Sequence, residues 1–196
     1  MPAPRHDRGR RFLLTASALL LLTWPFIVWL GIERGGLRWM LPLMAVLLLL
    51  RLRLGGAGRG PLRHGAMGAA LVAVFLCVAS LVLREYRLLL FYPVLVNAVL
   101  LVLFGGSLVT GVPLVERIAR WQDPALPAEA IPYTRRVTEI WCVFFLLNGG
   151  IALATCLHGD MAVWTAWNGL ISYLLIGGLM AGEWIVRQRV MAREQR

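Results

Sequence analysis

Apolar and charged positions alternate along this chain in long blocks. Short polar segments, which carry most of the charged residues, separate six runs of mostly aliphatic residues at about 12–32, 37–54, 65–83, 88–112, 137–157 and 161–183. Most of these runs approach the roughly 20 residues that a helix needs to cross a bilayer. Because acyl chains offer the backbone no hydrogen bonds, each run must satisfy its own amides as a helix. The pattern predicts an all-α fold, a polytopic transmembrane helical bundle of six spans.

The second run is the weakest of the six. The fourteen residues 37–50 reach about 21 Å as a helix, short of the roughly 30 Å hydrocarbon core. Extension to residue 54 restores the length if Arg51 and Arg53 extend their guanidinium groups toward the headgroups. Five spans therefore remain an alternative. The basic residues before the first run also suit a signal peptide, but the run is long enough to predict an uncleaved span.

The distribution of Arg predicts the orientation. We expect one transmembrane domain over 12–186, between basic tails at 1–11 and 187–196. The N-terminal tail, the second loop, the loop at 116–136 and the C-terminal tail carry four Arg each, whereas the other loops carry two, two and none. Cytoplasmic loops are enriched in basic residues, so both termini and the 116–136 loop should be cytoplasmic. All twenty basic residues are Arg, which suggests a GC-rich bacterial genome and hence the inner (plasma) membrane.

Composition excludes several classes of function. Hydrophobic residues make up 59% of the 196 residues and charged residues only 15%, too few to cover a soluble domain. The net charge of +10 does not indicate nucleic-acid binding, because the Arg residues flank apolar spans. Three isolated Cys in apolar runs and three distant His predict neither disulfide nor metal site. We find no catalytic motif and predict no cofactor.

One set of candidate residues lies in the predicted cytoplasmic loop. Arg beside aromatic residues suits anionic phosphate groups, because guanidinium binds phosphate with two hydrogen bonds and aromatic rings lie at headgroup level. The alternative is an interfacial loop whose Arg residues only orient the protein. The candidate headgroup or partner contacts are Glu116, Arg117, Arg120, Tyr133, Arg135 and Arg136.

A second set consists of polar residues within the spans. Asn97, Asn148 and Asn168 fall on three different spans, and Glu183 at the inner end of the last one. The amides could line a small polar cavity or form structural bonds between helices. Glu183 could pair with Arg187 four residues later or take part in a proton relay. Gly178 and Gly182 form a G-x-x-x-G pair, a spacing that lets helices pack closely.

Several motifs resemble a known family. They are Tyr92-Pro93 with Asn97, Glu116-Arg117-x-Ala119-Arg120, Leu126-Pro127, Tyr133-Thr134-Arg135-Arg136-Val137-Thr138, Trp141, Phe144-Phe145, Asn148, Trp164, Asn168-Gly169 and Tyr173. In these motifs the chain resembles uncharacterised bacterial inner-membrane proteins encoded among aryl-polyene or fatty-acid-synthase-like biosynthesis genes. The match covers a little over half of the chain.

A more distant similarity links Pro113-Leu114-x-x-Arg117, Trp141-x-x-Phe144-Phe145 and Trp164 to the intracellular septation protein A family. That family is associated with cell-envelope synthesis and division. The basic N-terminal half and Asn168-Gly169 depart from its pattern. Neither resemblance brings catalytic residues with it.

Together these observations favour a non-enzymatic inner-membrane accessory or scaffold protein for cell-envelope or polyene-lipid biogenesis. The expected partners are membrane lipids and a biosynthetic enzyme or acyl carrier protein at the cytoplasmic face. The sequence is also compatible with a homo-oligomer. One alternative is a small transporter or flippase of a lipid-like product that uses the Asn residues. Another is a septation-type envelope protein.

Overall fold

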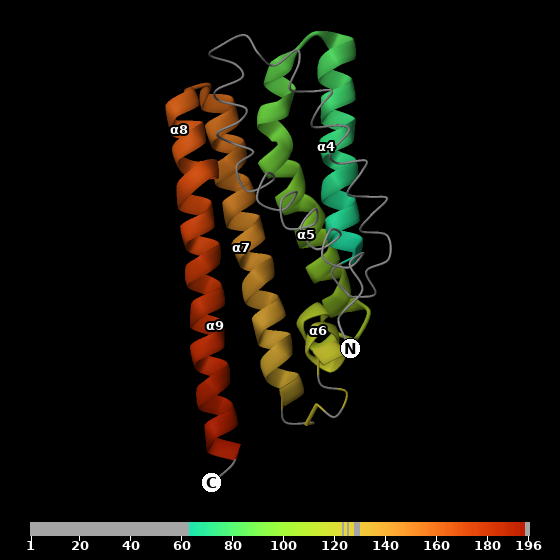
Figure 1. Cartoon of the computed structure of the whole chain (residues 1–196), viewed down its shortest axis with the longest axis vertical. Helices are drawn as coiled ribbons and strands as arrows, with labels where there is room; N and C mark the ends of the chain where they lie inside the picture. Colours follow the sequence, from blue (N-terminus) through green and yellow to red (C-terminus); the bar gives the residue numbers. More distant parts are fainter. Residues whose placement is uncertain (1–62, 123, 125, 128–129, 195–196) are drawn as a thin grey trace, which may run out of the picture.

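The computed structural model describes residues 63–122, 124, 126–127 and 130–194. The predicted tail at 1–11 and the predicted spans at 12–32 and 37–54 lie outside these residues. The described part is helical, and its long elements stand side by side along one axis (Figure 1). They are α4 (Arg63–Leu83), α5 (Tyr92–Val109), α7 (Ala130–His158) and α9 (Ser172–Glu194), with the short helices α6 (Leu114–Gln122) and α8 (Met161–Thr165) between them.

Within the described residues, three stretches of helix are long and apolar enough to cross a membrane: Arg87–Val109, Ala130–His158 and Met161–Gln188. They correspond to the predicted spans at 88–112, 137–157 and 161–183. The predicted span at 65–83 is helical as α4, whose apolar helix is shorter, Met67–Ser80. Only a small share of the apolar segment of each of these helices is buried inside the chain: 22%, 22% and 11%, in chain order. Their exposed apolar side chains therefore need a non-aqueous environment. These helices therefore indicate an all-α, multi-pass membrane protein.

Two helices extend beyond the predicted spans. The 116–136 segment contains α6 and the first two turns of α7, which begins at Ala130. Pro132 is compatible with this start, because the first turn of a helix needs no N–H donor there and tolerates proline. At the other terminus α9 continues through Glu194, because no Gly or Pro follows Gly182 and the intervening residues favour helix. Most of the predicted tail at 187–196 is therefore helical.

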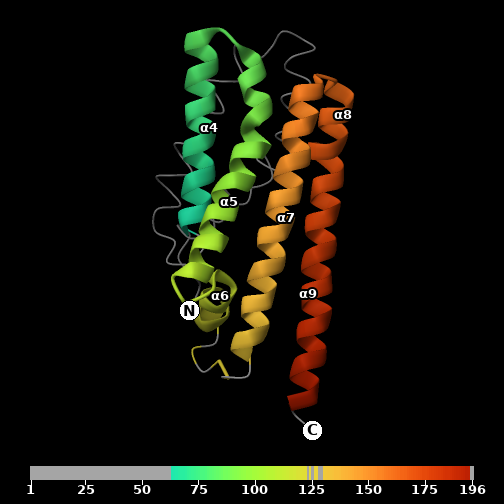
Figure 2. The ribbon, with the colours of Figure 1, turned by 180° about the vertical axis from the view of Figure 1, so that it is seen from behind.

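Helix α5 lies between α4 and α7 and packs against both (Figures 1 and 2). Small residues allow the close approach. A Cβ atom added at Gly149 of α7 would lie 3.0 Å from the Asn97 Cβ on α5, and one at Gly68 of α4 would lie 2.7 Å from Val99 Cγ1. The glycines of α9, by contrast, have no atom within 4 Å of an added Cβ. With the helices that the structure describes, the Gly178 and Gly182 pair therefore makes no close contact.

Two clusters of apolar side chains hold the bundle together. Near the turn between α4 and α5, Trp164 is 1% exposed and packs with Leu76, Cys77, Leu89 and Leu90. Its indole Nε1–H donates to the Leu90 carbonyl at 3.1 Å. Toward the opposite end, Phe104, Leu114 and Phe145 join α5, α6 and α7. The rings of Phe104 and Phe145 meet edge to face, with centroids 5.1 Å apart.

The last predicted span contains a local change of helix type. Asp160 caps α8 by accepting hydrogen bonds from the backbone N–H groups of Ala162 and Val163, at 2.8 and 3.1 Å. Residues Ala166–Ile171 then form a π-helical segment before α9 begins at Ser172. The Asn168 side chain donates to the Trp164 carbonyl at 2.9 Å, an interaction that competes with regular backbone pairing.

Candidate functional site

One end of the bundle is basic. The end of α5, α6, the start of α7 and the end of α9 lie at this end, which we call the basic end (Figures 1 and 2). The Arg residues on these helices at the basic end are Arg117, Arg120, Arg135, Arg136, Arg187, Arg189 and Arg193; those of the opposite end are Arg84 and Arg87. The predicted contact residues Glu116, Arg117, Arg120, Tyr133, Arg135 and Arg136 all lie at the basic end.

Helix α6 is fastened across this end by specific contacts. Gly111, at φ +93°, provides the turn that leads out of α5. The Ser107 hydroxyl then accepts a hydrogen bond from the Leu114 N–H at 2.8 Å, and the Thr138 hydroxyl accepts one from the Val115 N–H at 3.4 Å. These bonds satisfy two of the N–H groups that a helix start leaves unpaired. The start of α6 is thereby tied to both α5 and α7.

The two sides of α6 differ in polarity. Leu114 and Ala119 are buried, whereas Arg117, Arg120 and Trp121 are exposed. This nine-residue helix thus has an apolar side toward α5 and α7 and a basic, aromatic side outward. The charged residues of α6 were predicted from the sequence as contact residues, but the helix was not predicted, because a nine-residue segment between Pro113 and Pro124 resembles a loop.

The charged residues of α6 have unequal surroundings. Glu116 is 5% exposed, and its Oε1 accepts a hydrogen bond from Arg120 Nε at 2.8 Å. Arg117 pairs with no acid among the described residues. Its Nε donates to the Val112 carbonyl at 3.0 Å and its Nη2 to the Thr110 hydroxyl at 3.3 Å. The Arg120 charge is therefore largely compensated, and that of Arg117 is not.

The first turns of α7 contribute further polar groups. Arg135 forms an exposed ion pair with Glu139 at 3.3 Å, a kind of contact that contributes little to stability. Arg136 is exposed and has no ion pair within the described part of the chain. Tyr133 donates from its hydroxyl to the Glu183 carbonyl at 3.2 Å, and lies 3.5 Å from Glu183 Oε1. Glu183 thus joins the basic end and lies apart from the three Asn residues.

Asn97 and Asn148 form part of a continuous chain of hydrogen bonds through the bundle. The Asn97 Nδ2 donates to the Pro93 carbonyl at 2.8 Å, and Asn148 Nδ2 donates to Asn97 Oδ1 at 3.2 Å. Ser172 completes the chain by donating to Asn148 Oδ1 at 2.8 Å. All three side chains are buried. This Asn–Ser chain links α5, α7 and α9, an arrangement typical of structural bonds between membrane helices.

Asn168 belongs to a neighbouring but separate set. Its Nδ2 donates to the Thr155 hydroxyl at 3.2 Å and to the Trp164 carbonyl at 2.9 Å. Asn168 Oδ1 is buried and has no hydrogen-bond partner among the described residues, and the same holds for the side-chain polar atoms of Thr165 and Trp167. Thr155 and Ser172 were not predicted from the sequence as part of a polar set, although Ser172 follows Asn168 by four residues and so lies on a similar side of the helix.

Among the described residues, no three His, Cys, Asp or Glu side chains are grouped closely enough to hold a metal ion. Comparisons with family models, with curated proteins and with solved structures found no match to this chain. The two resemblances noted from sequence motifs therefore remain hypotheses.

Proposed function

We propose that this chain is a non-enzymatic accessory or scaffold protein of a bacterial inner membrane, with both termini in the cytoplasm. The basic end then faces the cytoplasm, since basic residues concentrate on that side of membrane proteins. The single observation that carries the proposal is the group of exposed cations on α6 and the first turns of α7, built onto a bundle whose apolar helices are suited to a bilayer. Cell-envelope or polyene-lipid biogenesis is the process that the motif resemblance suggests.

Arg135 and Arg136 are the best candidates for contact with a protein partner. Both are exposed, and they lie in the part of α7 that precedes Thr138, where α6 packs. A helix rises 1.5 Å per residue, so the two residues lie about 4.5 and 3 Å nearer the start of α7 than the contact of Thr138 with α6. An acidic surface, such as that of an acyl carrier protein, would complement them. Rim charges of this kind mainly steer association.

The test is binding of a purified acyl carrier protein, and of the enzymes encoded beside this chain, to the full chain in nanodiscs. The double variant Arg135→Ala and Arg136→Ala should reduce binding, whereas Arg84→Ala and Arg87→Ala, at the opposite end, should not. If the Arg135 and Arg136 double variant keeps full binding of every partner that the unchanged chain binds, the proposal fails.

A transporter or flippase of a lipid-like product is the second candidate. Thr165, Trp167 and Asn168 favour it, because each has a buried polar atom with no partner in the described part of the chain, and polar groups of this kind can line a substrate path. The Asn97 and Asn148 amides favour a structural role, since they bond with each other. Transport predicts that Asn168→Leu abolishes product export from cells while the amount of folded protein is unchanged. The septation-type alternative rests on motif resemblance alone.

A further inference from the structure

Helix α6 differs from the long helices in direction. In Figures 1 and 2 it lies across the end of the bundle, while α4, α5, α7 and α9 run along the axis. Only the four residues 110–113 separate it from α5, so it cannot leave the end of that span. An amphipathic helix held in this way, with its apolar side on the spans, lies in the plane of the membrane surface.

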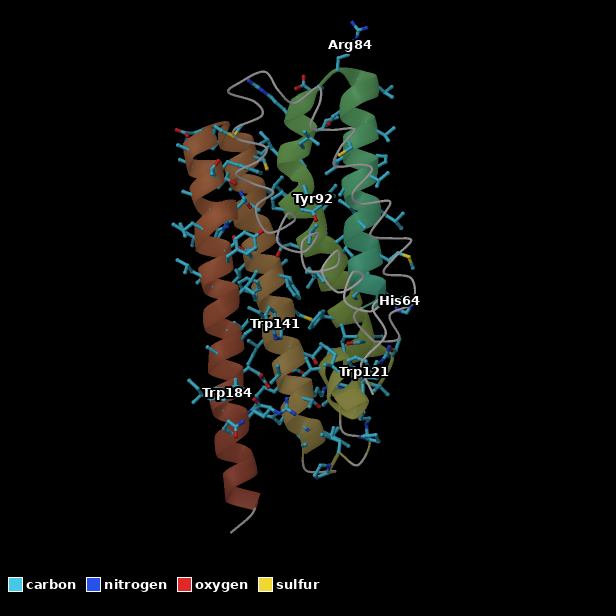
Figure 3. The ribbon with its side chains drawn as sticks, in the orientation of Figure 1. His64, Arg84, Tyr92, Trp121, Trp141 and Trp184 are labelled. Carbon is cyan, nitrogen blue, oxygen red and sulfur yellow. The ribbon has the colours of Figure 1, made fainter. Side chains whose placement is uncertain are left out.

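Two exposed Trp residues mark where that surface lies. Trp121 of α6 is 65% exposed and Trp184 of α9 is 61% exposed. Figure 3 shows them at a similar height along the bundle, on different elements. Exposed Trp side chains concentrate at the headgroup level of bilayers. At 1.5 Å per residue, the helical path from Asp160 to Trp184 is about 36 Å, close to the thickness of the hydrocarbon core.

Arg117 of α6 has a guanidinium group that can bind an anion at this level. Its bonds to the Val112 carbonyl and the Thr110 hydroxyl hold the guanidinium in one orientation. Within the described part of the chain they leave Nη1 with both of its N–H groups for an outside acceptor. Trp121 follows four residues later, so both side chains lie on one stripe of α6. Arg120 is less suited, because the buried Glu116 carboxylate compensates its charge.

We propose that Arg117 and Trp121 form a binding site for the phosphate group of an anionic phospholipid. The Arg117 guanidinium hydrogen-bonds the phosphate oxygens, and the Trp121 ring packs beside the glycerol and upper acyl region. This deepens the proposed function by assigning the α6 surface to lipid, which leaves Arg135 and Arg136 for a protein partner. An acidic protein on α6 is the competing occupant.

The experiment titrates the purified full chain in detergent with phosphatidylglycerol or phosphatidylcholine and counts bound lipids by native mass spectrometry. The unchanged chain should prefer phosphatidylglycerol. Arg117→Gln should weaken phosphatidylglycerol binding about fivefold, the effect of one Arg at an anionic surface. Arg117→Lys should keep part of the preference, because an ammonium retains the charge but not the two-pronged geometry. Arg87→Gln, at the opposite end, is the matched control and should change nothing.

Trp121→Ala is a second variant that should fold normally, because this exposed side chain contributes little to the core. It should lower binding of phosphatidylglycerol about two- to threefold. The proposal is overturned if the unchanged chain shows no lipid preference, or if Arg117→Gln and Trp121→Ala both match Arg87→Gln. It is also overturned if Arg117→Gln weakens acyl carrier protein binding while lipid binding stays the same. Failure of the lipid-binding proposal would not change the result expected for the Arg135 and Arg136 double variant. The lipid-binding proposal and the proposed function are therefore tested separately.

Discussion

Replacing Asn148 by Leu would test whether the Asn–Ser chain holds the helices together. Asn148 donates to Asn97 on α5 and accepts from Ser172 on α9. Leucine has the same branched skeleton of four side-chain heavy atoms but can form neither bond, so the substitution removes the central link while it keeps the shape of the side chain. Asn97 Oδ1 and the Ser172 hydroxyl would then be buried without this partner.

The expected loss follows from the two bonds. Hydrogen bonds between membrane helices contribute about 0.6 kcal/mol on average and up to about 1.7 kcal/mol. Two such bonds predict a loss of about 1–3 kcal/mol in the free energy of unfolding. Ser172→Ala removes only one of them and should cost about 1 kcal/mol. Combining the two substitutions should reveal a coupling energy of about 0.6–1.7 kcal/mol, because the two residues share a bond.

The assay is reversible unfolding of the full chain in mixed micelles with increasing denaturing detergent, followed by circular dichroism. Leu147→Ala is the matched control, because Leu147 is the preceding residue of α7 and is 61% exposed. It should change stability by less than about 0.5 kcal/mol. If Asn148→Leu costs no more than this control and shows no coupling to Ser172→Ala, the structural role of the chain is refuted. Loss of export at unchanged stability would instead indicate that Asn148 acts on a substrate.

Three further predictions concern the same measurement of stability. Gly149→Ala should destabilise the bundle by about 1–3 kcal/mol, because its new Cβ would lie 3.0 Å from the Asn97 Cβ and neither backbone can yield easily. Trp164→Phe should cost about 1 kcal/mol, since the Leu90 carbonyl loses its indole donor but keeps the Cys156 Sγ–H donor at 3.1 Å. Asp160→Ala should cost about 1 kcal/mol by removing the N-cap of α8.

Each of these has a control on the same element or of the same type. Gly150→Ala meets no atom within 4 Å and should be neutral or slightly stabilising. Trp184→Phe alters an exposed indole and should leave stability nearly unchanged. Asp160→Asn keeps a capping oxygen and should retain most of the stability that Asp160→Ala loses. Equal effects of any substitution and its control would contradict the corresponding argument.

Hydropathy along the chain was sufficient to locate the long helices. The runs at 88–112, 137–157 and 161–183 are three apolar helices in the structure, because transfer of a segment into lipid depends on the sum of its own residues. The ends of the helices were less predictable. Charged residues continue a helix into water without cost, so α7 begins at Ala130 and α9 reaches Glu194. Helix α6 was not predicted, because the apolar and polar residues of a short amphipathic helix cancel in an average of hydropathy along the chain.

The polar side chains show what the sequence could not decide. Three Asn residues on three spans looked equivalent, yet Asn97 and Asn148 share a bond while Asn168 pairs with Thr155. Glu183 was grouped with them and instead contacts Tyr133, fifty positions earlier in the chain. The sequence by itself determined that these groups must find partners, because hydrocarbon offers none. Only the packing of α5, α7 and α9 decided which partner each would meet, since that depends on the rotation and depth of one helix against another.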